Sequence, residues 1–373
     1  MPGGGRVDAS DSFVMTSSSY CSNLPLEEVV ALLGHPGSTL VTTHAKPDAD
    51  ALGSVVALVA AINRSGGCAT GRVMPPVPAP LEPMMRVAPI TLDEEASPLG
   101  SPDRIVVVDT GAWTQLEPMR KVLAVHLDRM LIIDHHLTGD VAAQWRWIDG
   151  SAAACCEMLV PLIRSLGRGD DLCRDPIIRD ALYAGIATDT GWFRFSNTGP
   201  GTLRVAADLV EAGVDHAGMY EQFEQKARPA KLRLLSVALE GMRWIAEDRA
   251  VVMALRQEDF QRVDAAMWET ERLVDIPQMV GRVQVVVLAT EMPGDSGGKS
   301  RVRLSFRSKP GPHAVDVAAL AGRFGGGGHA RAAGGQQSGT LEAVMEPLCR
   351  AVEEALEGAG EALLGDGGED SGV

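Results

Sequence analysis

The segment His44-Ala45-Lys46-Pro47-Asp48-Ala49-Asp50 follows the apolar run Leu40-Val41 and decides how the first half of the chain is interpreted. An apolar run that stops at a proline-containing turn predicts a strand that ends in a loop. This loop presents one imidazole and two carboxylates within seven residues. Strand ends lie side by side along one edge of a parallel sheet, and open α/β sheets bind ligands at that edge. The segment therefore predicts a functional corner of an α/β sheet.

Acid and imidazole groups recur at the ends of three later apolar runs. They are Asp109 after residues 105–108, Asp134, His135 and His136 after residues 131–133, and Asp189 after residues 185–187. A lone His or Asp is more often a loop residue or a helix cap than a metal ligand. Four such sets at four expected strand ends favour convergence on one point, so we predict a dinuclear metal centre.

The residue types indicate which ions and which reaction. Carboxylate oxygens mixed with imidazole nitrogens suit Mn²⁺ or a similar divalent ion. No cysteine is among the predicted ligands, which argues against a structural zinc site. Mg²⁺ and Co²⁺ remain alternatives. Two such ions stabilise both the attacking and the leaving oxygens of a phosphoryl displacement. Hydrolysis of a phosphoester is the chemistry that these residues predict.

Hydrophobic periodicity predicts an α/β protein with two domains. For the first, a mostly parallel sheet flanked by helices, we expect strands at 39–43, 104–108 and 130–133 and helices at 51–64, 114–124, 152–166, 176–188 and 201–212. For the second, a smaller α/β substrate-binding domain, we expect strands at 250–255, 283–290 and 301–306 and helices at 315–321 and 341–356. The expected boundaries are a disordered tail over 1–25, the first domain over 26–213, a helical connector over 214–245, the second domain over 246–356 and a disordered acidic tail over 357–373.

Composition excludes several classes of protein. The 373 residues are 45% hydrophobic, but no apolar run approaches the roughly 18 residues of a membrane span. The six cysteines show no CxxC spacing and are too scattered for a disulfide framework, which favours a reducing cytoplasm. A net charge of −15 argues against binding of long duplex nucleic acid. The predicted partners are therefore short anionic ligands, with a homodimer left open.

One region runs against the acidic average. Residues 299–331 hold seven cations and one acid. The same region contains the glycine run 325–328, whose backbone N–H groups can approach an anion closely, followed by His329 and Arg331 as charged donors. Glycine runs alone are usually loops, and no Gly-Lys-Ser/Thr follows to make a nucleotide P-loop. Beside Arg307, binding of an anion is the favoured interpretation.

The aromatic segment Trp192-Phe193-Arg194-Phe195 begins three residues after Asp189. A nucleobase could stack there, a contact worth about 1–3 kcal/mol per base in single-strand binders. Packing against the connector is an equal alternative.

These motifs together resemble those of the DHH phosphoesterases. The resemblance rests on His44-x-x-x-Asp48-x-Asp50, Asp109, Asp134-His135-His136 and Asp189, and on the C-terminal segments 305–309 and 325–335. The latter look like the DHH-associated domain of the RecJ and NrnA-like (oligoribonuclease and pAp phosphatase) branches. One departure is Ala49, where the family usually has glycine, and alanine there adds strain if the position needs a positive φ.

The resemblance implies a role for each motif residue. One ion is expected on His44, Asp48 and Asp109, and the second on Asp50, Asp109, His135 and Asp189, with Asp109 bridging. Asp134 is expected to orient an imidazole, and His136 to contact the scissile phosphate. Substrate binding is expected from Arg307, Ser308, Gly326, Gly327, Gly328, His329 and Arg331.

The predicted function is hydrolysis of short oligoribonucleotides to 5′-mononucleotides, together with hydrolysis of 3′-phosphoadenosine 5′-phosphate (pAp). A phosphodiesterase for signalling dinucleotides is the alternative within enzymes. A non-catalytic interaction protein of the same fold is the alternative of a different class, and the complete set of expected ligands argues against it.

Overall fold

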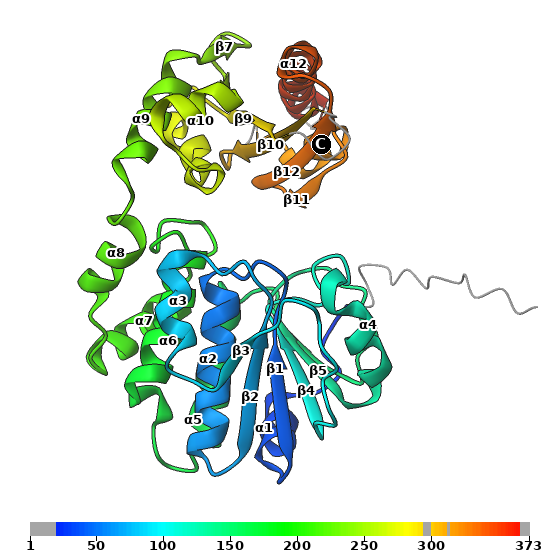
Figure 1. Ribbon diagram of the computed structural model, residues 1–373, viewed down its shortest axis with the longest axis vertical. Coiled ribbons are helices and arrows are strands. Elements are labelled where there is room, and N and C mark those ends of the chain that lie inside the picture. The colour runs from blue at the N-terminus through cyan, green and yellow to red at the C-terminus, as the bar shows by residue number, and fades with distance from the viewer. Residues whose placement is uncertain (1–19, 294–299, 312–313, 366–373) are drawn as a thin grey trace, which may run out of the picture. The chain divides into compact units, whose positions relative to one another are not determined.

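The computed structural model describes residues 20–293, 300–311 and 314–365. It divides into two compact units, Met1–Gln225 and Lys226–Val373 (Figure 1). Each unit has its own sheet and its own apolar core, and each is described by itself.

Unit 1 is built on a six-stranded sheet in which every neighbouring pair is parallel. The strands are β1 (Ser38–Thr42), β2 (Cys68–Val73), β3 (Ile90–Leu92), β4 (Arg104–Val108), β5 (Met130–Asp134) and β6 (Trp145–Ile148). Their spatial order is β3-β2-β1-β4-β5-β6, so the chain reverses direction across the sheet between β1 and β4. That switch point is where open α/β sheets bind ligands. The predicted mostly parallel sheet is confirmed.

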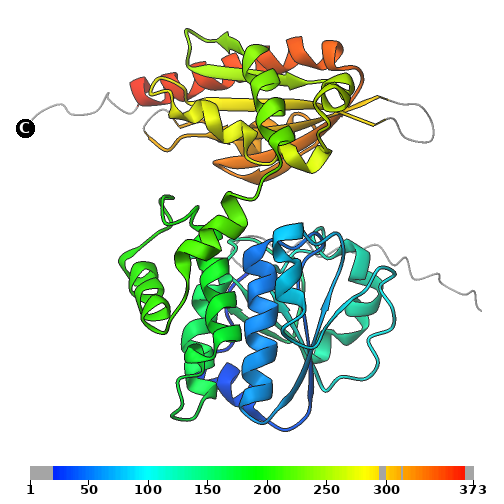
Figure 2. The ribbon, with the colours of Figure 1, turned by 60° about the vertical axis from the view of Figure 1, so that its left-hand side comes forward.

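Helices cover both faces of this sheet (Figures 1 and 2). They are α1 (Leu26–Gly34), α2 (Ala49–Arg64), α3 (Glu82–Met85), α4 (Arg120–Leu123), α5 (Cys155–Leu166), α6 (Pro176–Asp189), α7 (Pro200–Glu211) and α8 (His216–Glu224). Strand β4 shows why two layers form, because Val106 and Val108 pack with α2, α5 and α6 while Ile105 and Val107 pack toward α4. A strand buried on both faces has a continuous apolar sequence.

Several elements of unit 1 differ from the sequence prediction. The helix expected at 114–124 is a 3-10 turn at Glu117–Met119 followed by the short α4, because Pro118 cannot donate a backbone hydrogen bond. Strands β2, β3 and β6 were missed because their polar and partly exposed residues give a weak pattern. The disordered tail expected over 1–25 does not fit residues 20–24, because residues 21–24 are hydrogen-bonded along β6 and Tyr20 contacts Asp134 of β5.

Unit 2 contains a mixed six-stranded sheet of order β11-β12-β10-β9-β8-β7. Its strands are β7 (Arg243–Ile245), β8 (Ala250–Leu255), β9 (Val285–Met292), β10 (Arg301–Ser308), β11 (Gly327–His329) and β12 (Ala332–Ser338). Its helices are α9 (Pro229–Glu240), α10 (Gln257–Val263), α11 (Val317–Gly322) and α12 (Leu341–Gly365). Only β8 and β9 pair in parallel. The second, smaller α/β unit is confirmed.

Strand β10 separates the two faces of the sheet in unit 2. Val302, Leu304 and Phe306 are buried in the core that includes α11 and α12, while the alternate residues are half-exposed. Those alternate positions carry a row of three cations, which we call the cationic row: Arg301, Arg303 and Arg307. A period of two places all of them on one face of the sheet.

Helix α12 is longer than expected. It continues to Gly365, so residues 357–365 of the expected acidic tail are helical, and residues 366–373 lie outside the described part of the chain. None of the helices described here has the length and apolar character needed to cross a bilayer.

Candidate metal centre

The predicted ligands meet where β1 and β4 separate the two halves of the sheet in unit 1. Asp109 directly follows β4, His135 directly follows β5, and His44 lies two residues beyond β1. Asp109 has a φ of 62°, in the left-handed region that non-glycine residues seldom occupy. Strain of this kind is found at sites where the chain must aim a side chain.

Asp189 is the exception to the strand-end rule. It is the last residue of helix α6 rather than the residue after a strand, so its grouping with the strand ends was wrong. The run at 185–187 belongs to α6, as the helix expected at 176–188 already implied, so this run could not also end a strand. Its carboxylate still reaches the same cluster as the strand-end groups.

The side chains form three overlapping groups whose candidate ligand atoms lie within 4.8 Å of one another. The groups are His44 with Asp48 and Asp109, Asp50 with His135 and Asp189, and Asp109 with His135 and His136. Nε2 of His44 lies 3.5 Å from Oδ2 of Asp109. Nε2 of His135 lies 3.3 Å from Oδ1 of Asp109, 3.6 Å from Oδ2 of Asp189 and 3.8 Å from Oδ2 of Asp50.

The backbone orients both of the imidazoles that face the acids. Nδ1 of His44 lies 2.9 Å from the carbonyl oxygen of Ala45, and Nδ1 of His135 lies 3.3 Å from that of Ala152. When Nδ1 donates to a carbonyl, the lone pair is left on Nε2. Nε2 is the atom that points into the acidic cluster in each case. Metal-binding histidines are commonly held in this way.

The carboxylate of Asp50 is held by the start of a helix. Its two oxygens accept backbone N–H bonds from Cys155 at 2.6 Å and from Cys156 at 2.8 Å, the first two residues of α5. Helix N-termini favour negative charge because their amides are unpaired and the helix dipole is positive there. No local pattern predicts this contact, since 105 residues separate Asp50 from Cys155.

Asp48 and Ala49 form the start of helix α2. The Asp48 side chain caps the helix by accepting hydrogen bonds from the amides of Asp50 and Ala51. Ala49 is the first helical residue and does not have a positive φ. The expected strain at Ala49 is therefore absent, and alanine fits where the family usually has glycine.

Asp134 and His136 form a pair beside the ligand cluster. Nδ1 of His136 lies 2.7 Å from Oδ1 of Asp134, which also accepts the backbone N–H of His136. Asp134 is fully buried, so its contacts are protected from water. The carboxylate thus contacts both the ring and the backbone of His136.

The acids in this centre are crowded. Burial, together with the charges of Asp109 and Asp189, raises the pKa of Asp50 well above its usual value. Burial raises the pKa of Asp189 to about 7, although His135 acts against it. Burial opposes a charge on Asp109, but its contacts with His135 and His44 bring its pKa below the usual range. The raised pKa values of Asp50 and Asp189 mean that their charged forms are disfavoured in this cluster, and a bound cation would relieve that cost.

The imidazoles respond in the opposite direction. Burial opposes the charged form of His44, yet Asp109 and Asp48 raise its pKa to about 9. Burial likewise opposes charge on His135, while Asp109 and Asp50 raise its pKa to about 10. The pKa of His136 is also raised, against burial, by Asp134. Without bound cations, protons on the imidazoles therefore balance part of the negative charge of the carboxylates.

A buried oxygen tests whether metal ions fit. Oδ1 of Asp109 is buried and accepts no well-formed hydrogen bond from the described residues, although Nε2 of His135 is near. A buried carboxylate oxygen without a donor is costly unless a cation binds it. Mixed carboxylate and imidazole groups suit Mn²⁺, Fe²⁺ or Co²⁺ more than a purely oxygen-binding ion. The donor set therefore fits divalent ions shared through Asp109.

The predicted substrate residues of unit 2 lie around β10, β11 and β12. Nε of Arg307 lies 3.1 Å from Oδ1 of Asp275, and both side chains are about one-third exposed. Ser308 is buried, and its hydroxyl donates to the carbonyl of Val315. Arg331 donates to the same carbonyl at 3.0 Å. Ser308 thus supports the loop rather than facing a ligand, because its only donor is used internally.

The glycine run is partly a strand rather than a free loop. Gly327–His329 forms β11, paired antiparallel with β12, where Gly327 is opposite Gly334. A Cβ on Gly326 would lie 2.0 Å from the carbonyl oxygen of Gly334, so close pairing requires glycine there. The prediction missed both strands because glycine has low strand propensity. Gly326, Gly327 and Gly328 are exposed, and the side chain of His329 lies outside the described part of the structure.

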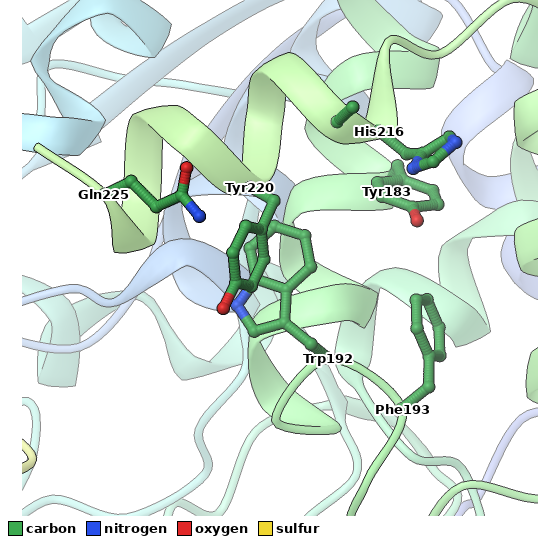
Figure 3. Close-up of a pocket in the computed structure, with 7 residues that line it drawn as sticks. Tyr183, Trp192, Phe193, His216, Tyr220 and Gln225 are labelled. Carbon is green, nitrogen blue, oxygen red and sulfur yellow. The ribbon is translucent and has the colours of Figure 1, made fainter.

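Trp192 and Phe193 of the aromatic segment after Asp189 pack within unit 1 (Figure 3), whereas Phe195 is exposed. Nε1 of Trp192 donates to Glu224 at 2.8 Å, and its ring lies edge-on to Tyr220 with centroids 4.8 Å apart. Phe193 contacts Tyr183, with centroids 5.9 Å apart. These contacts favour the packing interpretation, since the indole N–H and both rings already have partners.

Comparison with known proteins agrees with this geometry. Residues 38–186 match the DHH family, N-terminal domain, and residues 260–358 match the DHHA1 domain. The bifunctional oligoribonuclease and PAP phosphatase NrnA of Thermus thermophilus is 31% identical over 331 residues, which cover 87% of this chain and 92% of that protein. The chain belongs to the DHH family of phosphoesterases. It lies in the NrnA-like branch of that family, and the resemblance predicted from the motifs is confirmed.

One further curated relative and two solved structures each match most of this chain. The NrnA protein of Bacillus subtilis is 24% identical over 335 residues, covering 87% of this chain and 99% of that protein. An exopolyphosphatase-related protein from Bacteroides fragilis has the same fold, with a TM-score of 0.79 at 23% identity, covering 89% of this chain and 95% of that one. RecJ from Thermus thermophilus, solved with Mn²⁺, has a TM-score of 0.50 at 17% identity, covering 91% of this chain and 56% of that one. These similarities establish the DHH fold, and family membership makes the protein a hydrolase of phosphoester bonds.

Proposed function

We propose that this protein uses Mn²⁺ to degrade very short RNA oligonucleotides to 5′-mononucleotides, and that it also converts pAp to AMP. The observation that carries the proposal is the convergence of three imidazoles and four carboxylates at the switch point of unit 1. The chain also spans nearly the full length of relatives named bifunctional oligoribonuclease and PAP phosphatase.

The metal ligands in this proposal follow the clusters of side chains. One ion is assigned to His44, Asp48 and Asp109, and the second to Asp50, Asp109, His135 and Asp189. Bound divalent ions supply Lewis-acid activation of water and neutralise charge on the phosphate. The support for a shared Asp109 is that its carboxylate contacts both His44 and His135 through different oxygens.

His136 is assigned to the scissile phosphate. Asp134 accepts a hydrogen bond from Nδ1 of His136 and so holds the ring beside the acidic cluster, where Nδ1 lies 4.0 Å from Oδ1 of Asp109. An imidazole fixed on one side donates from the other with little loss of conformational entropy. Its hydrogen bond is aimed at an oxygen that gains negative charge during hydrolysis.

Unit 2 is assigned to the remote part of the substrate. Arg307 and Arg331 offer guanidinium groups, and the exposed glycines 326–328 together with His329 complete the proposed phosphate-binding surface. A guanidinium binds phosphate with two parallel hydrogen bonds. With a net charge of −15, the protein attracts a short anion locally rather than a long duplex. Within the described part of the chain no disulfide joins the six cysteines, which supports a reducing compartment such as the cytoplasm.

A side-by-side assay tests the proposal. Purified full-length protein is incubated with Mn²⁺ and with pAp, RNAs of two to five nucleotides, or cyclic dinucleotides, and products are separated by chromatography. The expected result is release of 5′-mononucleotides and AMP from the first two classes, stopped by a chelator and restored by Mn²⁺. Preferred cleavage of cyclic dinucleotides would replace the proposed substrate. If the protein shows neither bound metal nor Mn²⁺-stimulated turnover, the proposal that it is an enzyme is wrong and a non-catalytic interaction protein is favoured.

A further inference from the structure

A short segment before the first helix is fastened along the edge of the sheet in unit 1. Residues 20–24, which we call the N-terminal strap, run beside β6. The Ser22 hydroxyl donates to the carbonyl of Ile148 at 2.9 Å and accepts its N–H at 2.7 Å. Oδ1 of Asn23 accepts the N–H of Arg146 at 2.7 Å. The backbone N–H groups of Asn23 and Leu24 also donate to the carbonyl of Arg146. Side-chain and backbone bonds together therefore replace the missing neighbour of an edge strand.

The first residue of the strap, Tyr20, places its aromatic ring among the loops that follow β4 and β5. Tyr20 is only 6% exposed. A Cβ on Gly111 would lie 1.9 Å from the Tyr20 hydroxyl oxygen, and a Cβ on Gly139 would lie 2.3 Å from Cε2 of the ring. Gly111 follows Asp109 by two residues, so the loops that carry the site also form the slot for this ring. Any larger residue at either glycine would exclude the ring.

The Tyr20 hydroxyl contacts the carboxylate that holds His136. The hydroxyl donates to Oδ2 of Asp134 at 2.5 Å, while Oδ1 of the same carboxylate lies 2.7 Å from Nδ1 of His136. Each oxygen of Asp134 thus has its own donor, on opposite sides of the carboxylate. Burial and the neighbouring Asp134 raise the pKa of Tyr20, so its hydroxyl keeps the proton and acts as the donor.

We propose that Tyr20 is a positioning residue that acts on the substrate through Asp134 and His136. A buried carboxylate whose donors all reach Oδ1 can still rotate about its Cβ–Cγ bond, whereas a further donor on Oδ2 fixes that rotation. The fixed carboxylate then keeps the His136 ring aimed at the phosphate, where small misplacements lower the rate. This inference rests on the proposed contact of His136 with the phosphate. It gives the strap a part in the site, although Tyr20 touches no substrate.

The test replaces the hydroxyl and keeps the ring. Full-length Tyr20→Phe is compared with the wild-type protein on whichever phosphoester the latter cleaves: pAp, a dinucleotide or bis-p-nitrophenyl phosphate. We expect kcat to fall about tenfold while KM and bound metal stay unchanged, as for loss of a group that orients a site residue. Tyr220→Phe is the matched control, because it removes a hydroxyl from an exposed ring of α8, and it should keep the wild-type kcat.

A double-mutant cycle identifies the route of the effect. In a His136→Ala background, Tyr20→Phe should change kcat by less than about twofold, since the group it positions is already gone. An equal tenfold loss in both backgrounds, or an unchanged kcat in Tyr20→Phe, would overturn the inference. Wild-type protein inactive on every phosphoester would instead refute the proposed function. In that case the positioning role is tested separately by the ¹⁵N NMR signals of the His136 ring, which should differ between wild-type and Tyr20→Phe protein. Identical signals in the two proteins would refute the positioning role.

Discussion

The cluster of candidate metal ligands at the edge of the sheet in unit 1, which we call the functional edge, and the cationic row of unit 2 differ in how their charged side chains are paired. In unit 1, the ion-pair contacts of Asp50, Asp109 and Asp189 among the described residues are with imidazoles alone. In unit 2, Arg307 already has a carboxylate partner, Asp275, and both side chains remain partly exposed. The carboxylates of the first site thus face imidazoles as their charged partners. The second site is a partly exposed ion pair between a guanidinium and a carboxylate.

The two arrangements differ in how strongly they need a ligand. Buried carboxylates without sufficient positive charge carry a large desolvation cost, so the functional edge favours tightly held cations. An exposed ion pair contributes about 0–1 kcal/mol, so Asp275 can yield Arg307 to an incoming phosphate at little cost. If the proposed function holds, the charge balance at the functional edge is therefore the stringent requirement, and the contact with Arg307 is the adjustable one. Changes in unit 1 should therefore have larger effects than changes in unit 2.

The largest effect is expected from Asp109→Ala. Loss of the carboxylate shared by the two metal ligand sets should remove several kcal/mol of transition-state stabilisation and lower kcat about a thousandfold or more. Kinetics on a dinucleotide and metal analysis by mass spectrometry measure the outcome. Asp128→Ala removes an exposed acid of the same unit and should leave both quantities unchanged. Substantial turnover with both ions still bound would contradict the bridging role.

A smaller effect confined to substrate binding is expected from Arg307→Ala. Loss of charge-assisted hydrogen bonds worth about 1.5–3 kcal/mol should raise KM for oligonucleotides roughly 10- to 100-fold and leave kcat for bis-p-nitrophenyl phosphate near the wild-type value. Arg350→Ala, which removes an exposed cation from α12, is the control and should change neither. Equal losses on the two substrates would place Arg307 in the chemistry and would break the comparison between the two units.

The smallest effect is a pH dependence of stability in the metal-free protein. A group whose pKa is higher in the folded state stabilises that state below its unfolded pKa and loses the contribution as the pH rises to the folded value. That window runs from 6.5 to about 9 for His44, from 6.5 to about 10 for His135, and from 3.8 to about 7 for Asp189.

All three groups therefore act in the same direction. The thermal midpoint of the chelated protein should fall by about 2–6 °C between pH 6 and pH 9, measured by differential scanning fluorimetry. The Mn²⁺-loaded protein should show a flatter profile, because bound ions replace the protons on the imidazoles. A midpoint of the chelated protein that rises over this range would show that the acids are not crowded as described.

Much of the metal centre could be predicted from local sequence. His44, Asp109 and His135 each follow an apolar run by one or two residues, and a parallel sheet brings such strand ends together whatever the details of packing. Asp48 and Asp50 belong to the same corner. Asp189 reaches the same cluster, but from the end of helix α6 and not from a strand end, which agrees with the helix expected at 176–188.

Substrate-side features were predicted less well. Arg307 faces away from the core of unit 2 as the alternation in β10 requires, but the glycine run was taken for a loop because its strand pairing depends on close backbone approach rather than on side chains. Ser308 falls on the buried side of the same alternation. A strict period of two along 301–308 would have separated Ser308 from Arg307.

The sequence by itself determined the class of fold, the family, and which residue types meet at the switch point, because those follow from periodicity and from motifs a few residues long. Only the tertiary structure decided how the charges are held. The helix start that binds Asp50 is 105 residues away from it, and the ring that contacts Asp134 is 114 residues away. Contacts of that kind arise when distant segments pack, and a one-dimensional pattern carries no trace of them.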